Sequence, residues 1–134
     1  MKKSIFLKDI MTKRVVTVAS TLSIREIAKI MVRDGVSGVA VTSPERGVVG
    51  IVSECDVVYH FGKMNWGLLT AEEIMTPYVE AITPETTLEH AAEVMQKKQI
   101  HRLLVMDRDL SEPQMPAGIV SACDIVKEIG SENV

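Results

Sequence analysis

The sequence of 134 residues lacks several features that would assign it to a common functional class. Its two cysteines, Cys55 and Cys123, match no CxxC or metal-ligand spacing, so they predict neither a zinc site nor a redox motif. The formal net charge of −3 argues against nucleic-acid binding driven by bulk charge. No long apolar run follows the N-terminal Met-Lys-Lys, so we expect neither a signal peptide nor a membrane span. These absences predict a cytoplasmic protein whose cysteines stay reduced.

Catalytic and metal-binding patterns are also missing from the sequence. The three histidines, His60, His90 and His101, are scattered and predict no metal site. No combination of nucleophile, base and orienting residue is visible. We therefore expect no enzymatic activity and no required cofactor.

The sequence contains an internal repeat, and such a repeat determines the architecture of the fold. Gly-Ile-Val-Ser-Glu-Cys-Asp-Val-Val at residues 50–58 returns as Gly-Ile-Val-Ser-Ala-Cys-Asp-Ile-Val at residues 118–126, with seven of nine positions identical. Asp-Ile-Met-Thr at residues 9–12 returns as Glu-Ile-Met-Thr at residues 73–76. The fold is therefore a tandem of two similar halves.

The boundaries of the halves follow from the spacing of the repeat. We place the first half at residues 1–62, a linker at residues 63–72 and the second half at residues 73–134. The second half carries four extra residues in a loop at 107–116 that is rich in Asp, Ser and Pro. Trp66 of the linker has two interpretations, a plug over a core edge or a surface anchor for a partner, and the plug is favoured.

The helices are predicted by apolar spacing and by their ends. Ser23 with Glu26 forms the pattern of a capping box, and Gly35 lies where a helix C-cap glycine belongs. Apolar residues then recur at i, i+3, i+4 and i+7 in each half. They are Ile24, Ile27, Ala28 and Met31 in the first half and Leu88, Ala91, Ala92 and Met95 in the second. Short helices beginning near Ser53 and Ser121 close the halves.

Short β-branched and apolar runs predict the strands. In the first half they are residues 15–18, 39–41 and 48–52, and in the second half residues 79–82, 103–106 and 117–120. The order in each half is strand, helix, strand, strand, helix. This order predicts a mixed α/β fold of two β-α-β-β-α repeats, each a small three-stranded sheet with its helices on one face.

The Ser-x-x-Asp segments, Ser53 with Asp56 and Ser121 with Asp124, have two interpretations. A Ser at the N-cap with an acidic third residue is a capping box that needs no ligand. The same geometry exposes backbone N–H groups that attract phosphate, and the Asp could accept hydrogen bonds from the two hydroxyls of a ribose. Both interpretations can hold at once.

These motifs together resemble a tandem pair of cystathionine-β-synthase (CBS) domains, known as a Bateman module. The resemblance covers residues 5–129 and rests on the Asp-Ile-Met-Thr and Gly-Ile-Val-Ser-x-Cys-Asp segments, although the second copy of the first segment begins with Glu73. It implies a stand-alone pair with pseudo-two-fold symmetry. In the family the Asp of the second motif binds the ribose of adenosine nucleotides, and the Ser lies beside it.

The family's geometry implies two clefts, each built from both halves. One would combine Ser53, Asp56, Thr76, Ala81, His101 and Arg102. The other would combine Thr12, Thr17, Val36, Ser37, Ser121 and Asp124.

The two implied clefts differ in charge. His101 and Arg102 resemble the phosphate-binding pair in the nucleotide-sensing gamma subunit of AMP-activated protein kinase, and the planar guanidinium suits phosphate. The alternative is that Arg102 forms a surface ion pair and His101 is solvated. We expect one site for a charged nucleotide and a second that is empty or takes an uncharged adenosyl compound. Lys13, Arg14 and Arg33 could still supply charge to the second.

Many family members carry Arg or another polar residue where this chain has Cys55 and Cys123. The cysteines leave the sites less basic, and two small apolar fillers are favoured over a redox role.

The resemblance thus predicts a regulatory module that binds AMP, ADP, ATP or S-adenosylmethionine and signals to a partner protein by population shift. CBS pairs commonly form homodimers through their helices. Four methionines could line that face or pack in the core: Met11, Met31, Met75 and Met95. The alternatives are a ligand-free interaction or scaffold module and, weakened by the negative charge, a nucleic-acid-binding adaptor.

Overall fold

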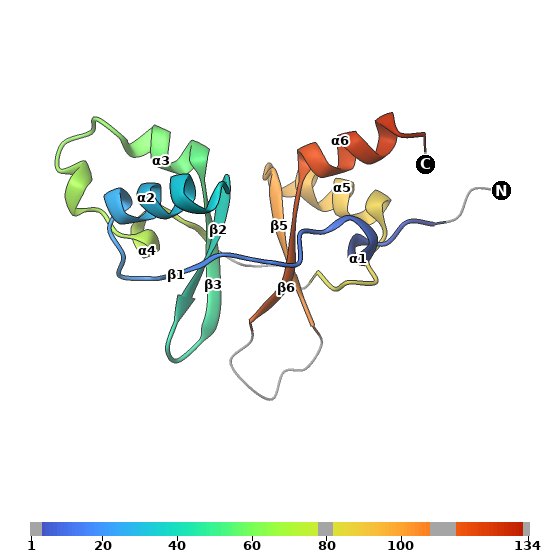
Figure 1. The fold of residues 1–134 in the computed structure, drawn as a ribbon, viewed down its shortest axis with the longest axis horizontal. Coiled ribbons are helices and arrows are strands. Elements are labelled where there is room, and N and C mark those ends of the chain that lie inside the picture. The colour runs from blue at the N-terminus through green and yellow to red at the C-terminus, as the bar shows by residue number, and fades with distance from the viewer. Residues whose placement is uncertain (1–3, 78–81, 108–114, 133–134) are drawn as a thin grey trace. The chain divides into compact units, whose positions relative to one another are not determined.

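The structure is a computed structural model that describes residues 4–77, 82–107 and 115–132. The chain forms two compact units, and each unit contains segments from both halves of the sequence (Figure 1). The β1–β4 unit consists of residues 16–77 with Met115, and the β5–β6 unit consists of residues 4–15, 82–107 and 116–132.

The β1–β4 unit contains a four-stranded sheet in the order β1-β2-β3-β4. Its strands are β1 (Thr17–Ala19), β2 (Gly38–Ser43), β3 (Gly47–Ser53) and β4 (Thr76–Pro77). β1 runs parallel to β2, and the other neighbours are antiparallel. The three expected strands are confirmed to within two residues, and the short β4 adds a fourth.

The helices of this unit are α2 (Ile24–Asp34), α3 (Glu54–His60), α4 (Ala71–Ile74) and the 3-10 turn η1 (Trp66–Leu68). The Ser23 side chain accepts the Glu26 N–H at 3.3 Å, so Ser23 is the N-cap of α2 as predicted. The other half of the predicted capping box is wrong, because the Glu26 side chain accepts a hydrogen bond from Lys29 at 3.3 Å. Gly35 ends the helix in the left-handed region at a φ of 64°, where glycine has no Cβ penalty.

The core of the β1–β4 unit lies between the sheet and its helices. Val39, Val41 and Val52 of the sheet are fully buried against the apolar face of α2, and Ala71 and Ile74 of α4 complete the cluster. Figure 1 shows α2 and α3 on the same side of β2 and β3. The spacing of apolar residues in α2 thus predicted which face is buried.

The β5–β6 unit has a similar arrangement, with a two-stranded sheet among its described residues. β5 (Arg102–Met106) pairs with β6 (Pro116–Ser121) in an antiparallel ladder. Its helices are α1 (Leu7–Ile10), α5 (Leu88–Lys98) and α6 (Ala122–Gly130). Of the strand expected at residues 79–82, only Ile82 is among the described residues; it is buried, and its carbonyl accepts the Met106 N–H at 2.8 Å.

The short helices α1 and α4 join segments that are distant in sequence. The Leu7 N–H donates to the Thr86 carbonyl at 2.8 Å, which holds α1 beside the start of α5. The Ala71 N–H donates to the Leu22 carbonyl at 2.8 Å in the same way, which holds α4 beside the start of α2. Each Ile-Met-Thr segment therefore packs with a repeat from the other half of the chain.

The two repeated motifs pack against each other through methionine and glycine. A Cβ added to Gly50 would lie 2.5 Å from Met75 Sδ, and one added to Gly118 would lie 2.5 Å from Met11 Sδ. Only glycine leaves room for either methionine. The paired motifs of the sequence are thus two sides of one packing contact, formed once in each unit.

The linker packs onto the β1–β4 unit. Trp66 is half-buried against the apolar cluster, and its ring centroid lies 5.1 Å from that of Phe61. The interpretation of Trp66 as a plug over a core edge is confirmed. Among the helices of the described residues, none has the length and apolar character needed to cross a membrane.

Candidate functional site

Both Ser-x-x-Asp segments form the predicted capping boxes. The Ser53 N–H donates to Asp56 Oδ2 at 2.8 Å, and the Asp56 N–H donates to Ser53 Oγ at 3.3 Å. At α6 the equivalent distances are 2.8 Å for the Ser121 N–H to Asp124 Oδ2 and 3.1 Å for the Asp124 N–H to Ser121 Oγ. In α3 the Ser53 hydroxyl also donates to Asp56 Oδ2, at 3.0 Å.

The caps leave part of each carboxylate available for another partner. Asp56 and Asp124 are both half-buried. Within the described parts of the chain, the hydrogen bonds to these side chains use Oδ2 and not Oδ1. A carboxylate has about four lone-pair sites, so a capping role and a ligand-binding role are chemically compatible.

The Ile-Met-Thr segments bring a threonine to the strand that leads into each cap. Thr76 of β4 lies opposite Ile51 of β3, two residues before Ser53. In the β5–β6 unit the Thr12 N–H donates to the Ile119 carbonyl at 3.0 Å, two residues before Ser121. Each unit thus assembles one serine, one aspartate and one threonine of the same predicted cleft.

The segments expected to contact phosphate lie at the starts of β2 and β5. The His101 carbonyl accepts the Ala122 N–H at 2.8 Å, and Arg102 lies opposite Ser121 in the ladder. Likewise, the Ser37 carbonyl accepts the Glu54 N–H at 2.9 Å. These segments therefore lie beside the cap of their own unit. Their predicted pairing with the cap of the other unit stays a prediction.

For the remaining described residues of the predicted clefts, the structure shows their burial and strand position but no hydrogen bond with the caps. Thr17 is half-buried in β1 opposite Ala40, and Val36 is half-buried just before β2. Ala81 lies outside the described residues. Arg33, considered as a source of charge for the second cleft, hydrogen bonds Asp34 at 3.0 Å, and this raises the pKa of the guanidinium.

The two cysteines do not fill space in the core. Cys55 and Cys123 are exposed free thiols at the second position of α3 and α6. The expectation of small apolar fillers is wrong, because this helical position points away from the apolar face that carries Val57 and Ile125. The described ranges of the chain hold no group of three His, Cys, Asp or Glu side chains placed to bind a metal ion.

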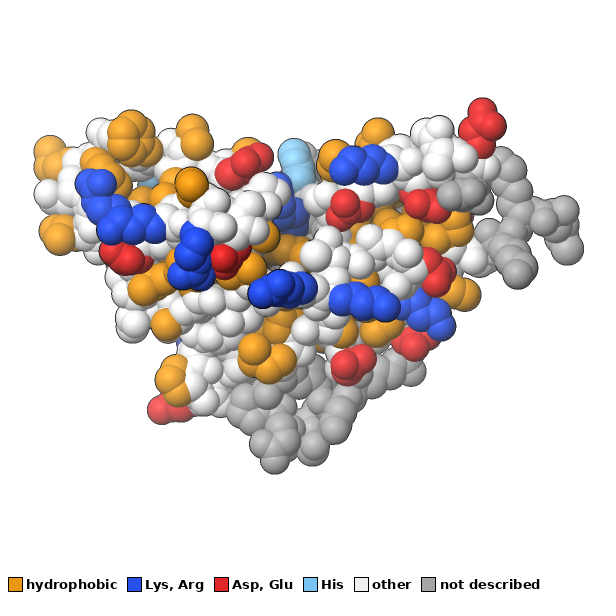
Figure 2. Space-filling view, in the orientation of Figure 1, with side chains coloured by type: hydrophobic (Ala, Val, Ile, Leu, Met, Phe, Trp, Pro, Cys, Tyr) orange, Lys and Arg blue, Asp and Glu red, His pale blue; other side chains and the backbone are white. Residues whose placement is uncertain are grey.

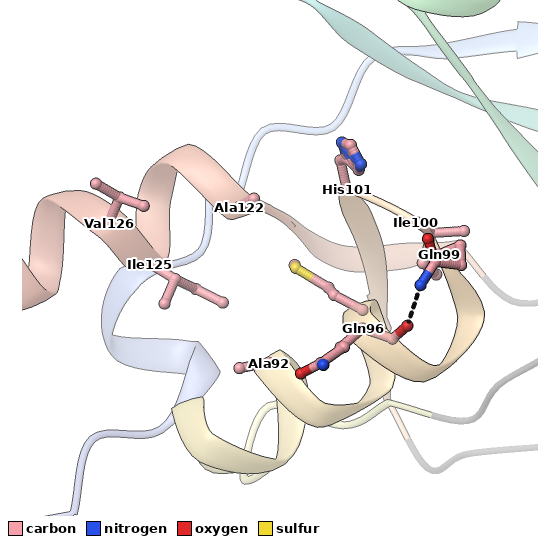
Figure 3. Close-up of a pocket in the computed structure, with 9 residues that line it drawn as sticks. Ala92, Gln96, Gln99, Ile100, His101, Ala122, Ile125 and Val126 are labelled. Carbon is pink, nitrogen blue, oxygen red and sulfur yellow. Dashed lines mark hydrogen bonds between the residues drawn. The ribbon is translucent and has the colours of Figure 1, made fainter.

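A groove of about 340 Å³ lies between α5 and α6 (Figure 3). Its walls are mainly apolar, and Gln99 at its rim donates from Nε2 to the Gln96 carbonyl at 2.9 Å. It is lined by Ala92, Met95, Gln96, Gln99, Ile100, His101, Ala122, Ile125 and Val126. This groove was not predicted from the sequence, although the small residues Ala92 and Ala122 indicate space between the two helices.

The comparison with known protein families decides the identity of the fold. The family model of the CBS domain matches residues 7–63 and again residues 71–131. The chain belongs to the CBS domain family. It is a tandem pair of CBS domains, as the repeated motifs predicted.

Relatives with known names are longer or comparable in length. The chain is 31% identical over 124 residues to homoserine O-acetyltransferase of Methanohalobium evestigatum, covering 92% of this chain and 24% of that protein. It is 30% identical over 104 residues to the CBS domain-containing protein YhcV of Bacillus subtilis, covering 76% of this chain and 73% of that protein. This CBS pair thus spans about a quarter of the length of the homoserine O-acetyltransferases it matches.

A solved CBS pair has a similar structure. The CBS domain pair of protein MJ0100, in complex with 5′-methylthioadenosine and S-adenosyl-L-methionine, aligns with a TM-score of 0.83 and 28% identity. The alignment covers 97% of this chain and 99% of that one.

Proposed function

We propose that this CBS pair is a regulatory module that binds an adenosine-containing ligand and signals to a partner protein. The observation that carries the proposal is the pair of capped aspartates. In each unit the cap uses Oδ2 of the aspartate, while a threonine is held on the adjoining strand. The carboxylate can accept ribose hydroxyls without giving up its cap. The similarity to the MJ0100 pair, which holds two adenosyl compounds, supports the ligand class.

The ligand is held by residues of both CBS domains in this proposal. Asp56 and Asp124 bind ribose, each in its own cleft. His101 and Arg102 supply phosphate contacts to the cleft of Asp56, while Val36 and Ser37 offer no charge to the cleft of Asp124. In this proposal a charged nucleotide such as AMP, ADP or ATP binds the first cleft, and the second cleft is empty or takes an adenosyl compound without phosphate, such as S-adenosylmethionine.

Signalling requires a surface that responds to the ligand, and we propose a homodimer formed through helices. The four methionines considered for that face pack inward instead: Met31 and Met95 are buried, while Met11 and Met75 cover the glycines. Other apolar side chains remain exposed at equivalent positions of α3 and α6 and just beyond α3. They are Val58, Phe61, Val126 and Ile129. A ligand that favours one arrangement of the pair then shifts the population presented to the partner.

Thermal unfolding in the presence of nucleotides tests this function. AMP, ATP and S-adenosylmethionine should raise the melting temperature, because a ligand that binds the folded state alone at 100 times its Kd adds about 2.7 kcal/mol. GMP should have little effect. Arg102→Gln should reduce the shift caused by AMP and leave that caused by S-adenosylmethionine unchanged.

The opposite result would favour a scaffold. If no adenosine compound shifts the melting temperature of the folded protein, the aspartates serve only as caps. The CBS pair would then be an interaction module without a ligand, which the complete capping boxes also permit.

A further inference from the structure

An apolar surface with two cations follows α3 in the β1–β4 unit. Three of its side chains are among the most exposed large hydrophobic residues of the described chain: Met64 at 91%, Leu68 at 77% and Tyr59 at 68%. Lys63 and Arg25 are exposed beside them. We call Arg25, Tyr59, Lys63, Met64 and Leu68 the linker patch. Figure 2 shows hydrophobic side chains on the surface over α3 and the segment after it.

Three of the few aromatic residues of the chain lie in or next to the linker patch. Only 4% of the residues are aromatic, yet Tyr59, Phe61 and Trp66 fall within eight positions. The equivalent end of α6 and the residue after it have the sequence Lys-Glu-Ile-Gly-Ser at residues 127–131, without an aromatic residue. Positions 127 and 129, which are equivalent to Tyr59 and Phe61, hold Lys127 and Ile129. The repeat therefore does not require an aromatic residue at these two positions.

The backbone holds the linker patch in one conformation. The Lys63 N–H donates to the His60 carbonyl at 3.2 Å, and the Trp66 N–H donates to the Lys63 carbonyl at 3.1 Å. Asn65 adopts the left-handed region at a φ of 60° between these turns. Trp66 anchors the segment to the core. A surface that is already ordered loses little conformational entropy when a partner binds it.

The segment that follows α3 carries Lys63 and no acidic residue, and Arg25 of α2 adds a second cation beside Glu26, which pairs with Lys29. No Asp or Glu occurs between Asp56 and Glu72. Lys63 Nζ lies 3.5 Å from the centre of the Tyr59 ring, and the Arg25 guanidinium lies 5.0 Å from the centre of the Trp66 ring. Cation–π contacts of this kind hold each cation over an apolar surface. In a chain of net charge −3, this is a local excess of positive charge.

We propose that the linker patch is the docking surface for an acidic, apolar segment of a partner protein. Carboxylates of that segment pair with Lys63 and Arg25, and its apolar side chains pack on Met64 and Leu68. Methionine adapts its shape to different apolar partners, and complementary charge fixes the orientation. This inference goes beyond ligand binding and does not depend on it.

Two other occupants fit the linker patch less well. Single-stranded RNA needs open aromatic faces for base stacking, but Lys63 lies over Tyr59, and Phe61 packs against Trp66. An anionic membrane is bound through several cations, and the linker patch contains two, Lys63 and Arg25. A protein segment with carboxylates requires neither.

Trp66 is the only tryptophan of the chain and so reports directly on the linker patch. Its emission is followed while the protein is titrated with an amidated peptide of about 18 residues, built from Glu, Leu and Ala with leucines at helical spacing. The control peptide has Lys in place of every Glu. We expect a saturable shift with the acidic peptide alone.

Variants of exposed residues place the binding surface. Lys63→Glu and Met64→Ser should each weaken binding at least about tenfold. The matched changes Lys127→Glu and Met115→Ser, at exposed positions that are not part of the linker patch, should alter binding less than about twofold. Circular dichroism confirms that each variant is folded.

Three outcomes would overturn the proposal. One is no saturable change in Trp66 emission with the acidic peptide. The second is equal loss of binding in Met115→Ser and Met64→Ser. The third is tighter binding of oligouridine or of phosphatidylserine vesicles than of the acidic peptide, which would assign the patch to RNA or to a membrane. Because no nucleotide is present, none of these outcomes bears on the adenosine site.

Discussion

The contact between methionine and glycine can be tested by adding a single methyl group. In Gly50→Ala the new Cβ would lie 2.5 Å from Met75 Sδ and 2.7 Å from the Thr76 carbonyl oxygen. In Gly118→Ala the three nearest atoms all belong to the Met11 side chain, at 2.5, 2.8 and 3.1 Å. The first substitution meets a backbone oxygen. The second meets Met11 Cγ and Sδ, which a rotamer change can move, and Met11 Cβ, which the backbone holds in place.

This difference sets the expected magnitudes. Overpacking a buried site costs about 1–3 kcal/mol of unfolding free energy. Gly118→Ala should lower the free energy of unfolding by about 1 kcal/mol, because the end of the Met11 side chain can change rotamer. Gly50→Ala should cost about 3 kcal/mol, because relieving it requires β4 to move away from β3. Gly50→Ala should also lower the affinity for any ligand that contacts Thr76.

Urea unfolding followed by circular dichroism measures both variants. A double-mutant cycle with Met11→Ala provides the control, since truncating the methionine makes room for the added methyl group. The cost of Gly118→Ala should largely disappear in the Met11→Ala background. If Gly118→Ala costs the same in both backgrounds, or if Gly50→Ala is neutral, the proposed packing of the two motifs is wrong.

Two further predictions concern helix ends and the dimer. Gln99 ends α5 in the left-handed region at a φ of 57°, so Gln99→Gly should stabilise the protein by about 0.5 kcal/mol. Gly35→Gln at the equivalent end of α2 should destabilise it by about 1–2 kcal/mol. A destabilising Gln99→Gly or a stabilising Gly35→Gln in urea unfolding would contradict this. Val58→Asp and Val126→Asp should each raise the dimer Kd at least about 100-fold in sedimentation velocity, with Met115→Asp as the control. If the wild-type protein sediments as a monomer, the proposed homodimer is wrong.

Local chemistry explains what the sequence predicted well. The capping boxes at Ser53 and Ser121 and the left-handed Gly35 depend on a few neighbouring residues, so their spacing was sufficient. The strands were predicted from β-branched runs, whose side chains pack against the helices. The mixed α/β fold with two repeats followed from the order of these elements.

Contacts between distant segments were harder to predict. The repeat alone does not say that Met11 covers Gly118 rather than Gly50, since either pairing satisfies the same motifs. The exposed position of Cys55 depends on the direction of the second helical residue, which composition does not reveal. The two clefts depend on how residues of both units combine, so His101 and Arg102 remain proposed ligands.

Calorimetric titration with AMP and S-adenosylmethionine tests whether the capped aspartates bind adenosine-containing ligands. Wild type is compared with Asp56→Asn and Asp124→Asn, because asparagine keeps an oxygen for the cap but loses the second carboxylate oxygen. We expect micromolar binding of AMP that weakens at least about tenfold in Asp56→Asn and changes little in Asp124→Asn. If the folded wild type binds neither AMP nor S-adenosylmethionine, the proposed adenosine-binding function is wrong.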